Sequence, residues 1–220
     1  MYSTSEFQKN LSYLNNIKID YYISPLLKKN DFIHAFFTKE SSKIDINSQG
    51  DKLIRNNYNN CILKQIHSNK IVLTSKLILQ KNFCADGLIC DEKNQNLWIY
   101  TADCMPILFA DKCQRRIAAV HCGRKGLEKN IIPNVIKSFE SMGSKRKDIL
   151  VSIGPSISGD KYLLDKKTYN EFFSSINRYF NKNKEKKFFT IPNNLEIHES
   201  ISLDIKKFAY LQLLRENLDP

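Results

Sequence analysis

The residues best suited to chemistry in this sequence are two histidines and a cysteine, His67, Cys104 and His121. Transition-metal ligands are in practice His, Cys, Asp and Glu side chains, and the chain has only four histidines. Three protein ligands of the His and Cys type leave a fourth tetrahedral position open, which is typical of a catalytic rather than a structural zinc. A metal held in this way polarises a substrate oxygen and lowers the pKa of a bound water.

Other interpretations of these residues stay open at the level of spacing. The three candidates lie tens of residues apart, without the short regular pattern of a zinc finger, and a buried His or Cys at a strand end often has only a packing role. Cys104 could also serve as a thiolate nucleophile beside a histidine. Of the other histidines, His34 within FIHAFF is interpreted as a core residue and His198, beside two acidic residues, as a surface residue.

Short β-like runs rich in Ile, Val, Leu and aromatic residues have to position these side chains. His67, Cys104 and His121 each lie at or next to the end of such a run, and strand ends converge in space. The runs are FIHAFF (32–37), CILKQIH (61–67), KIVLT (70–74), DGLIC (86–90), NLWIYTAD (96–103), PILFAD (106–111) and RIAAVHC (116–122).

The second half of the chain adds helices. Apolar residues recur at helical spacing from Leu127 to Met142, with Gly143 as the stop, and Pro133 predicts that the helix starts near it or bends there. A buried strand (148–155), a helix (166–180), a strand-like run (186–192) and a final helix from about Leu203 to Leu218 follow. We expect an α/β fold of the α+β type, with mixed β-sheets covered by helices; a doubly wound fold is disfavoured because several strands follow one another directly.

Composition sets the protein class. The 220 residues, 42% of them hydrophobic and 26% charged, suit one globular domain over residues 1–220. The opening residues lack a signal sequence, and the apolar stretch 97–110 is interrupted by polar residues and a proline, so we expect a cytoplasmic protein without a membrane role. The six cysteines include no CxxC pair and are expected to be reduced.

The net charge of +11 raises the question of a nucleic-acid partner. The positive residues are mostly lysines spread along the chain, and only 144–147 and 182–187 are densely basic. Positive charge alone does not indicate a protein that recognises a nucleic-acid groove, so nucleic-acid binding is disfavoured. A basic rim that attracts phosphate or a nucleotide accounts for the charge equally well.

Five ordered motifs carry a resemblance to a known family. They are KQIHSNKIV, ADGLICD, YTADCMPILFAD, AAVHCGRKG and SIGPSIS. In this order they resemble the laccase-domain proteins, also called the YfiH or multicopper polyphenol oxidase family, over roughly residues 32 to 165. The family's metal ligands fall on His67, Cys104 and His121, and its layered YfiH-like sandwich is the fold that the resemblance implies.

The resemblance implies a zinc-dependent enzyme of purine nucleosides. The expected reactions are phosphorolysis of adenosine, inosine, guanosine and methylthioadenosine, with phosphate as co-substrate, and deamination of adenosine. The catalytic candidates are Cys104, His121 and Asp103, with Asp103 as the carboxylate that moves protons. An Asp at this place could instead cap a turn or fix the ligand loop.

Further residues are candidates for binding the substrate. Gln65 and Asp86 could contact a ribose or a base edge, or could instead orient His67 and its loop. Arg124 and Lys125 precede a predicted helix and are candidate phosphate contacts, or else solvated residues of a glycine-permitted turn. Lys39 stands where the family has an arginine, and it keeps the charge without the bidentate fork.

The chain departs from the family pattern in three more places. Arg124 stands where the family has a tryptophan, and Ser41 and Ser42 stand where it has paired glycines. The segment from Thr38 to Cys61 looks shortened, and relatives continue beyond the final LDP. We therefore expect a shortened N-terminal loop region and C-terminus, in a reduced but active member of the family, a truncated one, or one whose oligomeric neighbour completes the site. Both a monomer and a homo-oligomer stay open.

Competing functions follow from the same residues. Copper-dependent phenol oxidation is one alternative, although a single His/Cys/His site suits one zinc ion better than a multicopper cluster. A cysteine hydrolase or editing role in cell-wall peptide metabolism, with Cys104 as nucleophile, is another. A basic nucleic-acid-binding module is the non-enzymatic alternative.

Overall fold

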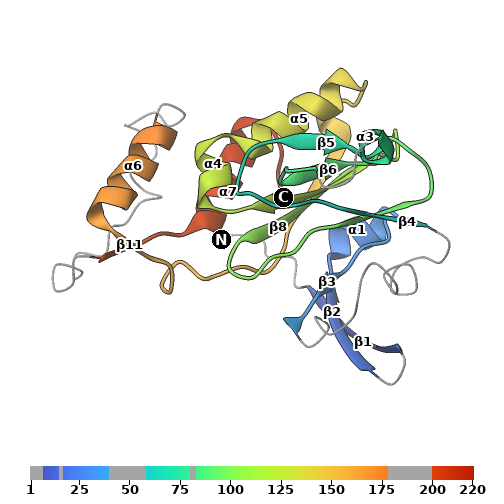
Figure 1. Ribbon diagram of the computed structural model, residues 1–220, viewed down its shortest axis with the longest axis horizontal. Helices are drawn as coiled ribbons and strands as arrows, with labels where there is room; N and C mark the ends of the chain where they lie inside the picture. The colour runs from blue at the N-terminus through green and yellow to red at the C-terminus, as the bar shows by residue number, and fades with distance from the viewer. Residues whose placement is uncertain (1–6, 15–16, 40–57, 80–82, 178–199) are drawn as a thin grey trace.

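A five-stranded sheet forms the centre of the protein (Figure 1). The computed structural model describes residues 7–14, 17–39, 58–79, 83–177 and 200–220. The strand order is β10-β8-β9-β6-β5, and all neighbours are antiparallel except β5 and β6. The strands are β5 (Ile71–Leu73), β6 (Gly87–Ile89), β8 (Met105–Asp111), β9 (Ile117–Cys122) and β10 (Ile149–Ile153).

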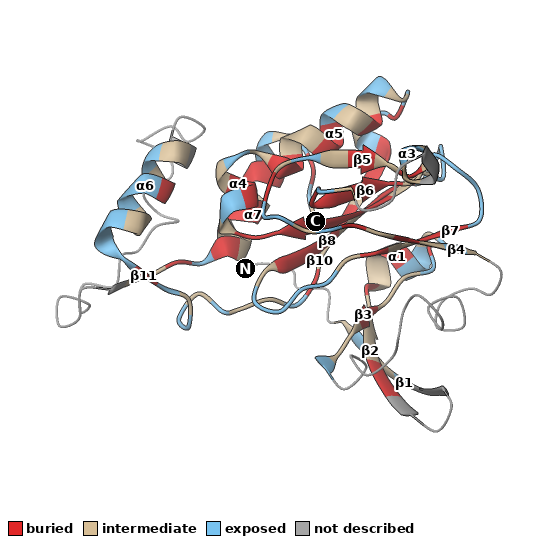
Figure 2. Ribbon diagram, in the orientation of Figure 1, coloured by how far each residue is buried: buried red, intermediate tan, exposed pale blue. Residues whose placement is uncertain are grey.

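Helices cover one face of this sheet, as the burial pattern in Figure 2 shows. They are α4 (Arg124–Glu128), α5 (Ile131–Ser141) and α7 (Ile205–Arg215). Helix α6 (Lys166–Asn177) packs onto α7 through the rings of Phe172 and Phe208, whose centroids are 4.8 Å apart. The short helix α3 (Thr74–Leu79) continues directly from β5. None of the helices that the structure describes is both long enough and apolar enough to cross a membrane.

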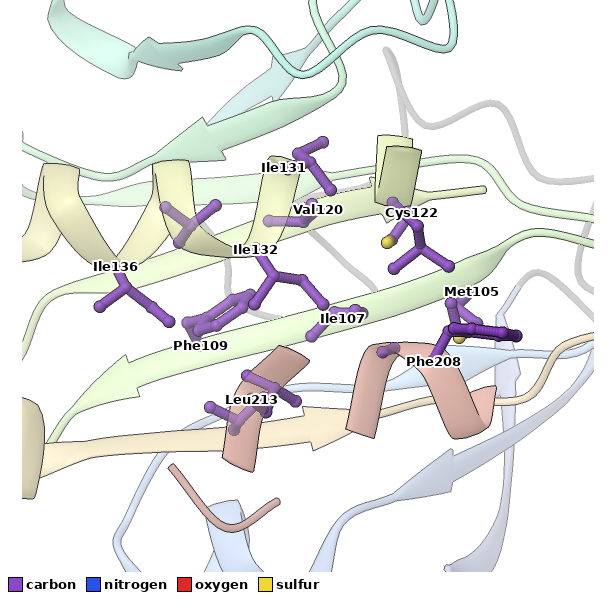
Figure 3. Packing of buried hydrophobic residues seen from close by; sticks show 14 of the residues in the cluster. Met105, Ile107, Phe109, Val120, Cys122, Ile131, Ile132, Ile136, Phe208 and Leu213 are labelled. Carbon is purple, nitrogen blue, oxygen red and sulfur yellow. The ribbon is translucent and has the colours of Figure 1, made fainter. Parts of the chain in front are cut away.

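Alternation along β8 separates the two faces of the sheet. Ile107 and Phe109 are buried under the helices, where they meet Ile132, Ile136 and Leu213 (Figure 3). The intervening residues face the other way, where α1 (Pro25–Lys29) packs against Ala110. Helices therefore cover one face of the sheet and α1 covers part of the other, and the alternation is a direct consequence of strand geometry.

Smaller sheets surround the central one. A three-stranded antiparallel sheet joins β1, β2 and β3, a parallel pair joins β4 and β7, and an antiparallel pair joins β11 and β12. Arg146 of the 3₁₀ turn η2 bonds to Glu140 and Glu216, and so ties the ends of α5 and α7 together. The element bounds are β1 (Gln8–Leu14), β2 (Ile17–Ile23), β3 (Phe36–Phe37), β4 (Asn59–Ile62), β7 (Gln95–Trp98), β11 (Leu163–Asp165), β12 (Ser200–Ser202) and η2 (Arg146–Asp148).

The expected fold class is confirmed: mixed sheets and helices form an α/β protein of the α+β type. The helix expected from Leu127 to Met142 is two helices, because Asn130 adopts a left-handed φ of 63° between them. Pro133 is the third residue of α5, where a backbone N–H has no intrahelical acceptor to lose. The helix thus starts near the proline rather than bending at it.

Other expectations needed correction. The strand expected at 96–103 ends at Trp98, so Cys104 directly precedes β8 instead of ending a strand. The strand expected at 61–67 ends at Ile62. The hairpin of β1 and β2 was missed, although Ile17, Ile19, Tyr21 and Ile23 alternate with polar or less apolar residues. The expected strand at 186–192, the end of the helix at 166–180, the segment 40–57 and His198 lie outside the described residues.

Phe139 tests the core that supports the sheet. Its side chain is fully buried on α5, and its ring centroid lies 6.4 Å from that of Phe109. Phe139→Ala removes a large buried ring and leaves a cavity that the surrounding core can fill only in part, so we expect the free energy of unfolding in urea to fall by about 3–5 kcal/mol. Leu214 on α7 is 40% exposed, so Leu214→Ala should lower the free energy of unfolding by less than about 1 kcal/mol. Equal losses in both variants would contradict this packing.

Candidate metal centre

The structure brings His67, Cys104 and His121 together. One ligand atom from each side chain lies within 4.8 Å of the others, and the two imidazole rings meet edge to face with centroids 4.8 Å apart. His67 is exposed, Cys104 is half-buried and His121 is buried. The cluster is therefore anchored in the protein on one side and open to solvent on the other.

Strand pairing places two of the ligands side by side. His121 lies in β9, opposite Pro106 in β8, and Cys104 is the residue just before β8. The loop after β10 supports this start of β8, because the N–H of Ile157 donates to the carbonyl oxygen of Asp103 at 3.0 Å. The motif SIGPSIS is thus a support for the Cys104 segment.

Gly123 makes room for the cysteine sulfur. A Cβ atom built on Gly123 would lie 2.5 Å from Sγ of Cys104 and 3.7 Å from Cδ2 of His67. The backbone there is extended, with φ −96° and ψ −177°, so the glycine is needed for space and not for its conformation. It caps α4, which therefore begins directly beneath the ligand cluster.

His67 lies in a turn beyond β4, with a left-handed φ of 57°. The turn is tied to the segment that leads to Cys104 by the Gln65 amide. Its Nε2 donates to the carbonyl oxygen of Tyr100 and its Oε1 accepts from the Tyr100 N–H, both at 2.7 Å. Through these two hydrogen bonds, Gln65 connects the His67 turn to the segment that leads to Cys104.

Asp86 lies beneath the two histidines and is fully buried. Its carboxylate accepts hydrogen bonds from His121 Nδ1 and from the backbone and hydroxyl groups of the His67 turn. Burial alone would raise the pKa of Asp86, but the hydrogen bonds from Ser68, His121 and the turn outweigh it and hold the pKa below its usual value. The carboxylate is therefore charged at neutral pH.

The donor set fits a divalent transition metal. Two imidazole nitrogens and one thiolate suit zinc or copper, and protein bonds to zinc are about 2.0–2.3 Å long. Atoms that all lie within 4.8 Å of one another can reach one such ion with small side-chain movements. Burial and the charges of Asp103 and Asp86 raise the pKa of Cys104, so the cation would supply the field that ionises this thiol.

Other candidate residues lie around a neighbouring cavity of about 970 Å³. Lys39 and Asp103, far apart in the sequence, both line it and both are exposed. Tyr100 and Thr101, which lie shortly before Cys104 in the sequence, also line the cavity. The lining of the cavity thus includes Asp103, the residue before Cys104, but none of the three ligands themselves.

The two basic residues after Gly123 differ in their surroundings. The guanidinium of Arg124 is paired with Glu128 one turn later in α4, and only 19% of its side chain is exposed. Lys125 is exposed and has no ion-pair partner among the residues that the structure describes. Lys125 is therefore the more available of the two for an anion.

His34 is separate from the cluster. Its Nδ1 lies 2.8 Å from the carbonyl oxygen of Phe32, and its Nε2 accepts from the Ser24 N–H at 2.8 Å. Burial lowers its pKa, so the ring is neutral at pH 7, but His34 is only half-buried and lines the cavity rather than the core expected from FIHAFF. Sequence reasoning missed Gly123, Tyr100 and Ser68 as parts of the site. Only Gly123 had a signal, its place directly after the HC pair.

Gly123→Ala tests the packing around the sulfur. The added methyl group should displace Cys104 Sγ without straining the backbone, and we expect the affinity for Zn²⁺ to fall by about tenfold or more in a competition titration with a chelating dye. Gly126→Ala is the control, because its Cβ would meet Ile131 and the Ser68 carbonyl oxygen at 3.3 Å or more and no ligand. Unchanged zinc affinity in Gly123→Ala would contradict the geometry.

Comparison with known proteins identifies the family of the chain. A family model described as multi-copper polyphenol oxidoreductase laccase matches residues 46–220. A purine nucleoside phosphorylase of Synechocystis is 35% identical over 146 residues, 60% of this chain and 52% of that protein. A Rickettsia prowazekii protein of the same name is 38% identical and covered to 63%, and one from Clostridium acetobutylicum is 31% identical over 94% of this chain and 84% of its own length. The chain spans less than two thirds of the first two relatives.

Solved structures show the same fold. YfiH of Bacillus licheniformis superposes with a TM-score of 0.66 at 20% identity, over 96% of this chain and 84% of that one. A DUF152 protein of Neisseria meningitidis gives 0.65 at 20% identity over the same shares. Because the family model matches well over half of the chain, this protein belongs to the multi-copper polyphenol oxidoreductase laccase family and has the YfiH fold.

Proposed function

We propose that this protein is a zinc-dependent enzyme of purine nucleosides. Its reactions are phosphorolysis of adenosine, inosine, guanosine and methylthioadenosine, and deamination of adenosine. The observation that carries the proposal is the cluster of His67, Cys104 and His121 beside a cavity large enough for a nucleoside. The names of the relatives, purine nucleoside phosphorylase, indicate the substrate class.

The nucleoside would lie in the cavity of about 970 Å³, next to the segment 100–104. Tyr100 is 54% exposed and lines this cavity four residues before Cys104. An exposed aromatic ring offers a face on which a purine can stack. Ile66, 42% exposed, is an apolar side chain next to His67 in the sequence. The base would therefore be held by these side chains, with the reacting atoms toward the ligand cluster.

Phosphorolysis also needs a cationic place for phosphate. Lys39 lines the cavity and Lys125 follows Gly123 at the cluster, and both are exposed. Arg124 is already paired with Glu128, so phosphate would have to compete with that carboxylate for it. We assign the phosphate contacts to the two lysines, with Arg124 as a more distant contribution to the positive potential.

The chain's own residues would then handle the protons. In phosphorolysis an oxygen of dihydrogen phosphate forms a bond to C1′ while the bond from C1′ to N9 breaks, and the carboxylate of Asp103 would take the proton of that phosphate and pass it to N7 of the departing purine. In deamination a water oxygen adds at C6, and Asp103 would carry a proton from that water to the amino nitrogen, which leaves as ammonia. A zinc ion bound by the cluster supplies Lewis acidity for these steps.

The alternatives are less well supported. A Cys104 nucleophile needs a lowered thiol pKa, whereas burial and the charges of Asp103 and Asp86 raise it. A multicopper oxidase needs many histidine ligands, but the chain has four histidines and His34 has a structural role. In the basic stretch 144–147, Arg146 is engaged with two glutamates, which leaves less positive charge for nucleic acid.

Activity of a ligand variant tests the proposed function. Zinc-loaded wild type should convert adenosine to adenine only with phosphate present, and to inosine without it. Cys104→Ala should lose bound zinc and at least about 100-fold in kcat/KM for both products, because the ligand is removed. Cys113→Ala, an exposed thiol away from the cluster, should retain both. A wild type that binds zinc but converts no purine nucleoside would refute the proposed function.

Tyr100 tests the place of the base. Tyr100→Ala should raise KM for adenosine by about tenfold with a smaller change in kcat, because a stacking surface is lost. Tyr100→Phe keeps the ring and should stay close to wild type. Since the backbone of Tyr100 makes the bonds to Gln65, neither variant should alter zinc content. An unchanged KM in Tyr100→Ala would remove Tyr100 from the substrate site.

A further inference from the structure

Asp86 has no surface with which to meet a substrate. Its exposed fraction is 0%, and it lies just before β6 in the interior of the protein. Both carboxylate oxygens are used by groups of the protein itself. A role in which it touches a ribose or a base edge does not agree with this burial, and its contacts point to the two histidines instead.

One set of contacts holds the His67 turn. Oδ1 accepts from the N–H of His67 at 3.0 Å, and Oδ2 accepts from the N–H of Ser68 at 2.6 Å and from its hydroxyl at 2.7 Å. The N–H of Ile66 also points at the carboxylate, at 3.2 Å from Oδ1. Successive N–H groups that converge on one anion hold the turn in a fixed shape. That shape includes the left-handed φ of His67, which costs free energy unless its surroundings hold it.

A second contact selects the tautomer of His121. Oδ1 of Asp86 lies 2.8 Å from Nδ1 of His121, and a carboxylate can only accept here, so Nδ1 carries the proton. The lone pair of the ring is then at Nε2, the nitrogen left for a metal. The N–H of His121 also donates to the carbonyl oxygen of Asp86 at 2.7 Å, so the backbone and the ring are fixed by the same residue.

We infer that Asp86 is the positioning residue of the metal centre, a single buried carboxylate that sets the turn of His67 and the tautomer of His121 at once. The inference rests on the proposed metal-dependent function. Cys104 is positioned by other means, the start of β8 and the gap at Gly123. Loss of the Asp86 charge should therefore weaken the two nitrogen ligands and leave the cysteine in place.

The test uses Asp86→Asn in the full chain. An asparagine keeps one acceptor oxygen but turns the other position into a donor, so it cannot accept from both His121 Nδ1 and the Ser68 groups. We expect the affinity for Zn²⁺ to fall by about 10–100-fold, as for the loss of other carboxylates behind histidine ligands. Nitrogen-15 NMR of metal-free wild type should show His121 protonated at Nδ1, and a mixture of tautomers in the variant.

Asp91→Asn is the matched control. Asp91 belongs to the same motif, ADGLICD, and its carboxylate accepts from Thr74 Oγ1 and from the N–H and hydroxyl of Ser75, away from the cluster. This variant should lose stability but keep the zinc affinity and the His121 tautomer of wild type. An equal loss of zinc affinity in both variants would show that Asp86 acts only through general stability, and the inference would fail.

A second variant and a measurement on wild type test the same inference if Asp86→Asn does not fold. Ser68→Ala removes one hydroxyl donor to Asp86 and should lower zinc affinity by a few-fold with His121 still protonated at Nδ1. In metal-free wild type, His121 protonated at Nε2 would overturn the inference without any variant. A wild type that binds no zinc would refute the proposed function, while the tautomer would still decide the role of Asp86.

Discussion

The hydrogen bond from His121 Nδ1 to the buried carboxylate of Asp86 is the interaction on which the rest of the site depends. A charged carboxylate with no exposed surface is stable only when donors surround it, and here the donors are a ligand side chain and the turn that carries another ligand. The requirement to satisfy one buried charge thus orders two metal ligands. Because these donors come from β9 and from the turn after β4, the carboxylate of Asp86 connects the central sheet to the turn that follows β4.

The packed sheet explains why this arrangement can be rigid. Beneath the cluster, β8 and β9 are held between the helices α4, α5 and α7 on one side and α1 on the other. Cys104 begins β8 and His121 lies in β9, so their separation is fixed by strand register. The open side of the cluster instead carries exposed groups, Tyr100, Asp103 and His67. Rigid ligands and an accessible rim are what a catalytic metal site requires.

Much of this could be predicted from the sequence. Runs rich in Ile, Val, Leu and aromatic residues predicted the central strands, and helical spacing predicted α5. His67, Cys104 and His121 do come together, but only His121 lies near the end of a strand as expected. Two strand ends were predicted wrongly, for a physical reason. The runs at 61–67 and 96–103 look like continuous strands, but they leave the sheet after Ile62 and Trp98, because the turn at His67 and the loop at Tyr100 are held by tertiary bonds from Asp86 and Gln65. The spacing of residues in the sequence does not predict such bonds, and it did not predict the ion pair between Arg124 and Glu128.

X-ray absorption at the zinc edge tests most directly whether one zinc ion binds to His67, Cys104 and His121. For protein loaded with one equivalent of zinc, we expect a four-coordinate shell with one sulfur at about 2.3 Å and two imidazole nitrogens at about 2.0–2.1 Å, completed by one light atom. The sulfur contribution should disappear in Cys104→Ala. A wild-type shell without sulfur, or one with fewer than two imidazoles, would contradict it.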